Sequence, residues 1–400
     1  MKGRDMKSVT LTCPRWIRYS FAVLISGVVL FQGGIMNAQQ KITLRETIEQ
    51  LNKHTSLITL GDEKKGFLVL APDYGARIVA MSANGIDGKN LMWINPKIME
   101  KSFWEGEKRD WNLGGARTWI APEDEFYLDK DNNWFVPAPM DPGKYKLDKK
   151  AKNSLVCSNT FSIKNKSGQS YSVKISRDIS LLERSPKAAK LVTGGVKFVG
   201  MKFTHSLENL GKETIGKDLP FMGLWSLIQI YPGGTMIIPV KPSADKKSLP
   251  YRDYFNPIPP ERMSFSDNIV TVKIDGQYRC KYGIAPWGAD GHIAFLSKPD
   301  KSGEGVLFIK EFTVDPKGKY LDHPWGKPSK YGDAIQMYND DGKMGGFAEI
   351  ECHAPAKVLK QNTKNTQTVV LLAYVGKVES LKKIAADILH RDLSKIKLFD

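Results

Sequence analysis

Cysteine is scarce in this sequence. Four cysteines occur among 400 residues, and three of them lie after the first 38 residues: Cys157, Cys280 and Cys352. Three widely spaced cysteines form neither a disulfide framework nor a zinc knuckle, because both need closely grouped or paired cysteines. One disulfide could still form, but three buried thiols are the simpler expectation.

Several catalytic and cofactor-binding motifs are absent too. The chain has no HExxH metalloprotease motif, no phosphate-binding GxxxxGK and no GxSxG nucleophile turn. Asp129, Asp131 and Asn133 in LDKDNN look like calcium ligands, but the segment lacks the glycine and the distal glutamate of an EF-hand. We interpret that segment as a polar turn, and we expect no metal and no cofactor.

The N-terminal apolar run is short. It covers Tyr19–Phe31, which is too short to span a bilayer stably. Five basic residues precede or flank it, and a small-residue cleavage site ending at Ala38 follows, which is the pattern of a secretory signal peptide. We expect residues 1–38 to be removed, and the mature protein to be exported to the periplasm or the medium of a bacterium without membrane contact.

Acidic residues are fewer than basic ones. The 59 Lys and Arg residues against 43 Asp and Glu residues give a net charge of +16, and removal of residues 1–38 leaves +12. Such an excess suits an acidic glycan or a nucleic acid, but Arg-rich blocks are absent and the lysines are scattered along the chain. We interpret the charge as solvated surface and expect no nucleic-acid partner.

The mature chain shows no linker and no repeat of fixed period. Hydrophobic residues make up 41% of the full sequence, which is enough for one large core or two modest ones. Period-two alternation, interrupted by hairpin dipeptides such as Asn84-Gly85 and Asp275-Gly276, predicts strands over 56–60, 67–71, 77–80, 171–177, 196–207, 269–274, 292–296 and 306–313. Helical periodicity is confined to 44–53 and 380–397. This pattern predicts one all-β domain over 39–400, a large antiparallel sandwich with a short N-terminal helix and a C-terminal helix.

The segment from Asn112 to Glu125, NLGGARTWIAPEDE, concentrates polar and aromatic chemistry. Arg117 offers five donors in a rigid fork, and Trp119 offers a flat face on which a pyranose ring can stack. Glu123 adds an acceptor after Pro122. These residues favour a sugar-binding wall. The alternative is the start of a strand, in which Arg117 pairs with Glu123 and Trp119 belongs to the core.

Three further blocks carry a resemblance to a known group. They are the hairpin from Gly61 to Trp93, which contains GARIVAMSANGIDG, the strand KFTHSLENLG from Lys202 to Gly211, and GGFAEIECHAPA from Gly345 to Ala356. In this order they resemble the galactose mutarotase-like (aldose 1-epimerase-like) superfamily, in a branch of secreted bacterial proteins. The resemblance implies a β-supersandwich, a broad antiparallel sandwich with a concave face that binds sugars.

The resemblance also implies site residues. In these enzymes a glutamate removes the proton from the anomeric hydroxyl and a histidine protonates the ring oxygen. His205 falls at the family's histidine, and Glu349 or Glu351 at its glutamate. Aligning Gly346-Phe347 and Pro355 with the family pattern places the carboxylate between these two glutamates, at Ile350, and a one-residue slip reverses the sheet face. The first histidine of the family's pair has no counterpart here.

Glu349 and Glu351 lie two residues apart on a predicted strand, so both point to one face. Two close carboxylates raise the pKa of one of them, which lets an acid and a base coexist near neutral pH. Alternatively, one or both face solvent or pair with Lys310 or Lys343. His353 has the same parity and is either a proton donor or a structural hydrogen-bonding group.

The remaining candidates are less specific. His205 alternates with Phe203 and Leu207, which fits a core histidine as well as a site histidine. Trp225 and Gln229 in GLWSLIQIYPGG are candidate sugar-binding residues, as is Lys281 in YRCKYG, although Trp225 also fits a core position.

Together these residues favour an exported carbohydrate-active protein that performs acid-base chemistry at or near the anomeric carbon of a sugar, as an aldose 1-epimerase-like isomerase would. Two alternatives stay open: a non-catalytic glycan-binding protein on the same scaffold, and a lyase or hydrolase acting on a modified sugar. We expect a mono- or oligosaccharide as partner and a monomeric protein. The site prediction is that one pocket is lined by Arg117, Trp119, His205, Trp225 and at least one of Glu349 and Glu351.

Overall fold

The computed structural model describes residues 44–62, 65–105, 110–187, 190–192, 195–242, 251–327 and 331–399. The chain divides into two units, residues 1–40 and 41–400, and every element below belongs to the second. The predicted signal peptide, residues 1–38, lies outside the described residues. Among the described residues, no helix combines the length and the hydropathy needed to cross a membrane.

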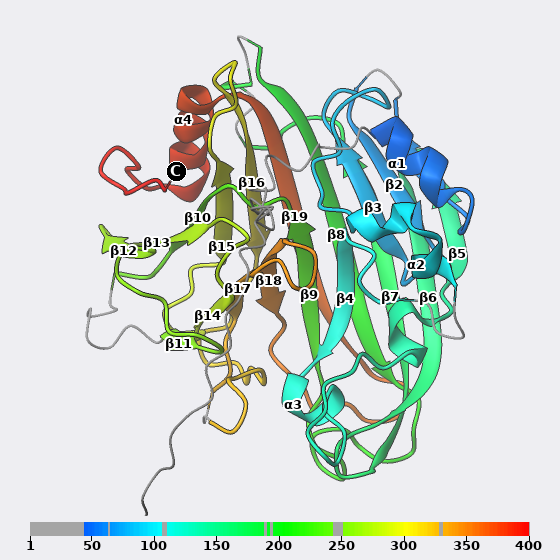
Figure 1. Cartoon of the computed structure of the whole chain (residues 1–400). Coiled ribbons are helices and arrows are strands. Elements are labelled where there is room, and N and C mark those ends of the chain that lie inside the picture. Colours follow the sequence, from blue (N-terminus) through cyan, green and yellow to red (C-terminus); the bar gives the residue numbers. More distant parts are fainter. Residues whose placement is uncertain are drawn as a thin grey trace, which may run out of the picture. The chain divides into compact units, whose positions relative to one another are not determined.

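One sheet has nine strands, and every pairing in it is antiparallel. Its central strands come from distant parts of the chain, which Figure 1 shows as neighbouring ribbons of different colours. In spatial order the strands are β1 (Ile58–Gly61), β2 (Phe67–Ala71), β3 (Arg77–Ser82), β4 (Ala116–Ala121), β9 (Gly223–Ile230), β18 (Ala348–His353), β17 (Ile335–Asn339), β14 (Cys280–Ile284) and β11 (Tyr251–Asp253).

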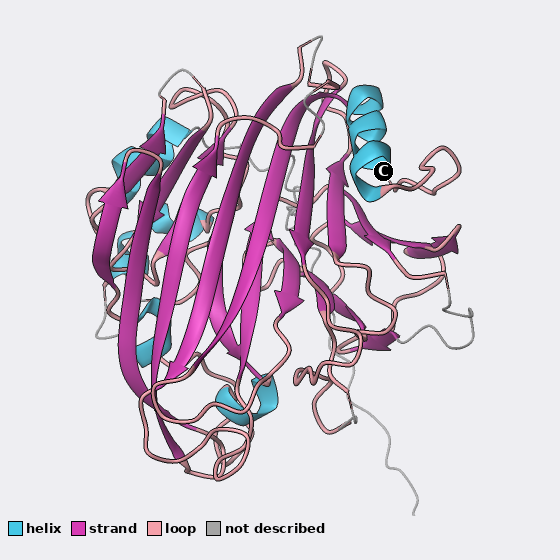
Figure 2. Ribbon diagram, turned by 180° about the vertical axis from the view of Figure 1, so that it is seen from behind, coloured by secondary structure: helices cyan, strands magenta, loops and turns pink. Residues whose placement is uncertain are grey.

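The second sheet has ten strands, again paired antiparallel throughout, and its long strands fill the view in Figure 2. The all-β antiparallel sandwich predicted from the sequence is therefore confirmed. In spatial order the strands are β12 (Met263–Ser266), β13 (Ile269–Ile274), β10 (Gly234–Pro239), β15 (His292–Ser297), β16 (Glu304–Phe312), β19 (Lys364–Lys377), β8 (Lys197–Asn209), β7 (Ser170–Leu182), β6 (Ser154–Lys164) and β5 (Lys146–Ala151).

Burial differs between the two sheets. Along β7 the burial alternates from residue to residue, because one face packs on the core and the other faces solvent. Along β9 and β18 every residue is buried. The nine-stranded sheet is therefore covered on both faces at its centre, with the other sheet on one side and helices and loops on the other. The main core between the sheets includes Ile78, Phe203, Ile228 and Ile350.

Helices cover the outer sides of both sheets. The helix α1 (Leu44–Leu51) packs Leu44 and Leu51 against the β2–β3 region, and α2 (Lys101–Trp104) lies close by (Figure 1). The short helix α3 (Glu123–Phe126) follows β4, and single helical turns occupy Pro96–Met99 and Pro139–Gly143.

The C-terminal helix is shorter than predicted. Helix α4 (Val378–Leu389) buries Leu381 and Ile384 against apolar residues of the ten-stranded sheet, but it does not continue to residue 397. His390 takes the left-handed conformation (φ 52°), which ends the helix. The chain then turns back, so that the backbone N–H of Phe399 donates to Thr235 Oγ1.

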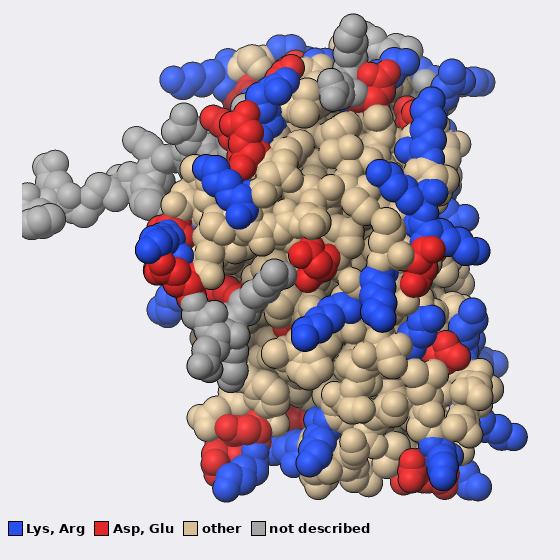
Figure 3. All heavy atoms as spheres, turned by 90° about the vertical axis from the view of Figure 1, so that its right-hand side faces the viewer, with Lys and Arg blue, Asp and Glu red and all other residues tan. Residues whose placement is uncertain are grey.

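Two smaller expectations can be compared with the structure. Cys157, Cys280 and Cys352 are buried free thiols, which confirms the simpler expectation for them. On the side where α1 and β5 lie in Figure 1, lysine and arginine side chains are spread over the surface and interspersed with acidic ones (Figure 3). The positive charge on that face is dispersed, as the sequence suggested.

Candidate functional site

The candidate site lies on the face of the nine-stranded sheet that points away from the ten-stranded sheet. Directly paired residues of neighbouring strands share a face. This register places one continuous set of side chains on the site face. They are Arg117 and Trp119 from β4; Trp225, Leu227 and Gln229 from β9; Glu349, Glu351 and His353 from β18; Gln336 and Tyr338 from β17; and Lys281 from β14.

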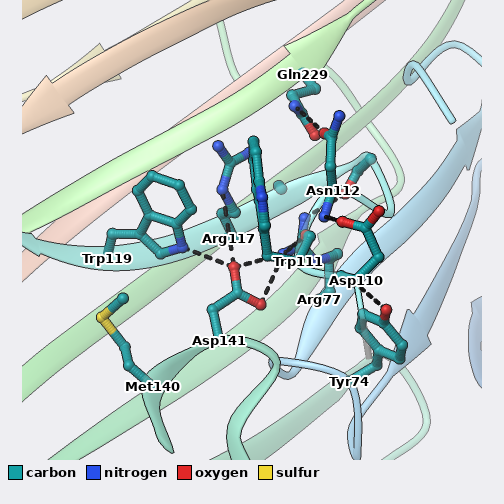
Figure 4. Close-up of polar contacts among 12 residues, drawn as sticks. Tyr74, Arg77, Asp110, Trp111, Asn112, Arg117, Trp119, Met140, Asp141 and Gln229 are labelled. Carbon is teal, nitrogen blue, oxygen red and sulfur yellow. Dashed lines mark hydrogen bonds and ion pairs between the residues drawn. The ribbon is translucent and has the colours of Figure 1, made fainter. Parts of the chain in front are cut away.

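Arg117 is held by Glu349 from across the sheet. Its Nη2 donates to Glu349 Oε1 at 2.7 Å, and its guanidinium stacks over the rings of Trp119 and Trp111, with the guanidinium carbon 4.3 and 5.5 Å from the ring centres. Figure 4 shows the guanidinium between the two indoles, above Asp141. Arg117 Nε and Nη1 are buried and have no hydrogen-bond partner among the described residues, although Nε lies 4.0 Å from Asp141 Oδ2.

Asp141 lies beneath this stack and holds Trp119 and Arg77 through hydrogen bonds. It accepts hydrogen bonds from Trp119 Nε1 at 2.6 Å and from Arg77 Nη2 at 2.6 and 2.8 Å (Figure 4). The alternative pairing of Arg117 with Glu123 is wrong, because Arg117 pairs with Glu349 instead. Trp119 is buried, as that alternative expected, and it also forms part of the wall beside Arg117.

Glu351 has one anchored and one unpartnered oxygen. Its Oε2 accepts from Trp225 Nε1 at 2.8 Å and lies 3.2 Å from Lys281 Nζ, whereas Oε1 has no partner among the described residues. The side chain is 0% exposed. Burial raises the pKa of Glu351 to about 7 against the opposing effect of Lys281, and the Glu349 carboxylate adds to the rise.

Lys281 is the cation of the cluster. Its Nζ lies over the ring of Trp225, 4.4 Å from the ring centre, and 4.0 Å from Asp322 Oδ2. Burial alone would lower the pKa of Lys281, but the carboxylates of Glu351, Asp322 and Glu123 raise it above its usual value. The ammonium group therefore stays charged at neutral pH.

Asp322 and Gln336 complete the network, and sequence analysis missed both. Gln336 Nε2 donates to Asp322 Oδ2 at 2.8 Å, while Asp322 Oδ1 accepts from the backbone N–H of Glu123 at the start of α3. Both residues have ordinary polar side chains in the sequence, one in a loop and one in a strand. Only the strand register and the path of the 319–327 loop bring them to the site.

Glu123 is enclosed by two indoles. Trp134 Nε1 donates to its Oε1 at 2.9 Å, and Trp325 Nε1 donates to its Oε2 at 3.2 Å. Burial raises the pKa of Glu123 to about 7, with Lys281 opposing the rise. Glu123, Trp134 and Trp325 thus tie two loops together next to Lys281.

His353 lies in the cluster as a neutral ring. Its Nε2 donates to Gln336 Oε1 at 2.9 Å, and the ring stacks on Trp225 with 5.2 Å between ring centres. Burial lowers the pKa of His353 to about 3. At neutral pH this imidazole can accept a hydrogen bond through Nδ1, which has no partner among the described residues, but it has no acidic proton to give.

His205 lies elsewhere, so the prediction that it lines the same pocket is wrong. It belongs to the ten-stranded sheet and points into the layer between the sheets, where Nδ1 lies 3.0 Å from Thr118 Oγ1 and Nε2 lies 2.9 Å from Gln367 Oε1. Thr118 is next to Arg117 in β4 and faces the opposite way. Burial lowers the pKa of His205 to about 3. The alternation with Phe203 and Leu207 reflects a core position.

Two other residues named from the sequence, Lys310 and Gln229, take different positions. Lys310, considered as a partner for the glutamates, lies on the core side and donates to the backbone oxygens of Ser226 and Ile350. Gln229 is on the site face, where its Nε2 donates to Asn112 Oδ1 at 3.0 Å and its Oε1 is buried without a partner among the described residues. The described residues contain no cluster of three His, Cys, Asp or Glu side chains that could hold a metal ion.

Comparison with known proteins gives structures of similar fold and one family. The chain is similar to a candidate aldose 1-epimerase from Escherichia coli K12, at 13% identity and a TM-score of 0.48, over 80% of this chain and 98% of that one. It is also similar to a galactose mutarotase-like protein from Lactobacillus casei ATCC 334, at 10% identity and a TM-score of 0.43, over 80% of this chain and 100% of that one.

A galactose mutarotase related enzyme from Lactobacillus acidophilus is similar at 10% identity and a TM-score of 0.40, over 79% of this chain and 96% of that one. Similarity at this level says nothing about activity. A comparison with curated proteins finds no match. Residues 43–399 match the family described as "Family of unknown function (DUF6786)", and the chain therefore belongs to that family.

Proposed function

We propose that this protein binds a carbohydrate on the outer face of the nine-stranded sheet and transfers a proton at or next to the anomeric carbon, with Glu351 as the proton-transferring group. The proposal rests on the environment and the pKa of the Glu351 carboxyl group. One oxygen is fixed by an indole N–H and an ammonium group, the other is buried without a partner, and the pKa of Glu351 is raised to about 7.

A carboxyl group with this pKa accepts and returns a proton near neutral pH, which is the condition for efficient general acid-base catalysis. Lys281 stays cationic and stabilises negative charge that develops on a sugar oxygen beside Glu351. Arg117 Nη1 and Gln229 Oε1 supply an unused donor and an unused acceptor for hydroxyl groups. The indole of Trp225 supplies an apolar face.

Glu351 suits the role of base better than Glu349, because Arg117 already binds Glu349. The acid that the mutarotase resemblance assigns to a histidine cannot be His205 or His353, since the pKa of each imidazole is lowered to about 3. Glu123 is the second carboxyl group whose pKa is raised to about 7, and it takes the acid role in this proposal. Because Glu351 is fully buried, a sugar must displace side chains that cover it.

The non-catalytic alternative is supported by one observation. The imidazole of His353, which faces the cluster, is neutral at neutral pH and therefore cannot supply the proton donor of the mutarotase mechanism. In that case Arg117, Trp119 and Trp225 bind a glycan without changing it.

The deciding experiment compares wild type, Glu351→Gln and a matched control, Glu304→Gln, in which an exposed glutamate of β16 is changed. Polarimetry and exchange NMR on a panel of hexoses, pentoses and uronic acids measure anomer interconversion, and calorimetry measures binding. Glu351→Gln should lower the rate by about 10² to 10⁴ while keeping the affinity, because the amide keeps the shape but cannot take the proton. Glu304→Gln should match wild type. Binding without acceleration in all three proteins would establish the non-catalytic alternative, and absence of both would refute the proposal.

We also infer that the mature chain is exported after cleavage behind Ala38, on the basis of the N-terminal sequence pattern. N-terminal sequencing of the protein from a periplasmic or culture fraction should give Gln39 as the first residue. Retention of residues 1–38 in the cytosolic fraction would refute export.

A further inference from the structure

A pocket of about 340 Å³ lies next to the Arg117 stack. This volume is within the range of roughly 300–1,000 Å³ that is usual for small-molecule sites. Its lining combines an indole, three carboxylates and apolar side chains, supplied mainly by Phe103, Glu105, Asp110, Trp111, Val136 and Asp141, with Ala138 and Ser102 at its side.

Two lining residues connect this pocket to the Glu351 cluster. The Trp111 ring centre lies 5.5 Å from the guanidinium carbon of Arg117, and Asp141 Oδ2 lies 4.0 Å from Arg117 Nε (Figure 4). Arg117 in turn binds Glu349, which shares a strand face with Glu351. The pocket lining therefore contacts Arg117, whose partner Glu349 lies on the same strand face as Glu351.

The chemistry of the lining suits a sugar ring. Trp111 is partly exposed and packs edge-on against Trp134 at 5.3 Å between ring centres, which fixes the plane of its indole. Asp110 Oδ1 accepts the backbone N–H of Asn112 at 2.8 Å, which fixes a carboxylate beside that indole. An aromatic face stacks on the apolar C–H side of a pyranose, while a carboxylate accepts hydrogen bonds from its hydroxyl groups.

We propose that this pocket is an outer subsite, which binds a second sugar unit of an oligosaccharide while the reacting unit lies at Glu351. The inference rests on the proposed function and narrows its substrate class, because a ligand that fills both places is an oligosaccharide and not a free monosaccharide. Trp111 is the main contact of the second unit, and Asp110 binds its hydroxyl groups.

The test is titration calorimetry with three monosaccharides and their linear β-1,4-linked trimers: D-glucose with cellotriose, D-galactose with β-1,4-galactotriose, and D-xylose with xylotriose. In wild type, a trimer should bind roughly three- to tenfold more tightly than its monosaccharide, which is the effect of one good aromatic contact. Trp111→Ala should remove this advantage.

A second variant distinguishes loss of the subsite from a folding defect caused by Trp111→Ala. Ala138 is exposed at the pocket, so Ala138→Trp fills the pocket without deleting a core contact and should also abolish the trimer advantage. The matched control is Trp287→Ala, which removes an exposed indole that stacks edge-on against Tyr331 and should keep the advantage.

The outcomes separate the two proposals. If a monosaccharide binds but its trimer binds no more tightly, or if Ala138→Trp keeps the trimer advantage, the subsite is refuted and the proposed function stands. If none of the six sugars binds wild type, the proposed function is refuted and the subsite with it.

Discussion

The two faces of β9 and β18 both bury charged groups, but they use them differently. On the face toward the ten-stranded sheet, Lys310 donates to the backbone oxygens of Ser226 and Ile350 at 2.8 and 3.0 Å. Both ring nitrogens of His205, which points into the same layer, are also hydrogen-bonded. On the opposite face, Glu351 Oε1 and Arg117 Nη1 are buried without a hydrogen-bond partner among the described residues.

This difference separates a structural role from a binding role. Buried polar atoms in native proteins nearly always have a partner, so a group of them with unused capacity marks a place where water or a ligand binds. Arg177, on the inner side, also leaves two nitrogens without a partner, but like Lys310 it donates to backbone oxygens of the facing sheet, those of Ala76 and Ala116. The charged side chains on the inner face link the two sheets through hydrogen bonds, whereas those on the outer face surround the candidate site.

The largest expected effect comes from breaking the outer ion pair. Arg117→Met leaves the Glu349 carboxylate buried without its cation, which should lower the free energy of unfolding at pH 7 by about 3–5 kcal/mol. Urea denaturation followed by tryptophan fluorescence measures this change.

The double variant Arg117→Met, Glu349→Met is the control for the pair. It should recover most of the lost stability, because neither charge remains to be compensated. If the double variant is as unstable as the single one, the pair is not the reason for the loss, and the outer face is held by packing alone.

Whether a strand could be predicted from the sequence depends on which of its faces are buried. Strand β13 has the predicted bounds, because polar and apolar residues alternate and hairpin dipeptides follow. Strand β19 was not predicted, since its first half alternates but its second half, VVLLAY, lies between the core and α4 and is apolar throughout. In this half of β19, where both faces are covered, the alternation is lost.

The site was predictable where a motif or a spacing pointed to it. Arg117 was identified by its donor fork beside Trp119, and Glu349 and Glu351 by the mutarotase resemblance and by their spacing of two residues on a predicted strand. Asp322 and Gln336 gave no such signal, since their roles arise only from pairing across strands and loops. His205 was misplaced because the resemblance assigned it to the site, while its alternation with Phe203 and Leu207, which also fits a core histidine, does not show which sheet the strand joins.

The second prediction concerns the pH dependence of stability. The ordinary carboxyl pKa is 4.5, and the pKa of Glu351 in the folded protein is about 7, so the folded state binds more protons between these values. The stability that Glu351 contributes is present below pH 4.5 and is lost as the pH rises through about 7.

Glu351→Gln removes this titration. The unfolding free energy of wild type relative to Glu351→Gln should therefore fall by about 3 kcal/mol between pH 4.5 and pH 8. Thermal and urea unfolding over this range measure the difference. A constant difference would mean that the carboxyl group has an ordinary pKa and that the outer face is no site for proton transfer.

The third prediction tests the inner face. Lys310→Met keeps the length of the side chain but removes the donor to two backbone oxygens, and it should lower the free energy of unfolding by about 1–3 kcal/mol. Sugar affinity and the pH profile of any activity should match those of wild type once folding is complete. A shifted pH profile would show that Lys310 acts on the outer carboxylates and is not only a link between sheets.

The smallest effect at neutral pH is expected for His205→Gln. Glutamine can keep one of the two hydrogen bonds, so the loss at pH 7 should be about 1 kcal/mol. The ordinary imidazole pKa is 6.5 and that of buried His205 is about 3, so the unfolded state binds more protons between these values. Stability from this histidine is present above pH 6.5 and is lost as the pH falls.

The free energy of unfolding of His205→Gln relative to wild type should therefore rise by about 2 kcal/mol as the pH falls from 6.5 to 5. The stability that His205 contributes is thus lost towards low pH, whereas the stability that Glu351 contributes is lost towards high pH. Unfolding curves at pH 5, 6 and 7 measure this. If His205→Gln instead loses sugar turnover at pH 7 with its stability intact, His205 would belong to the site, and the separation between a structural inner face and a chemical outer face would fail.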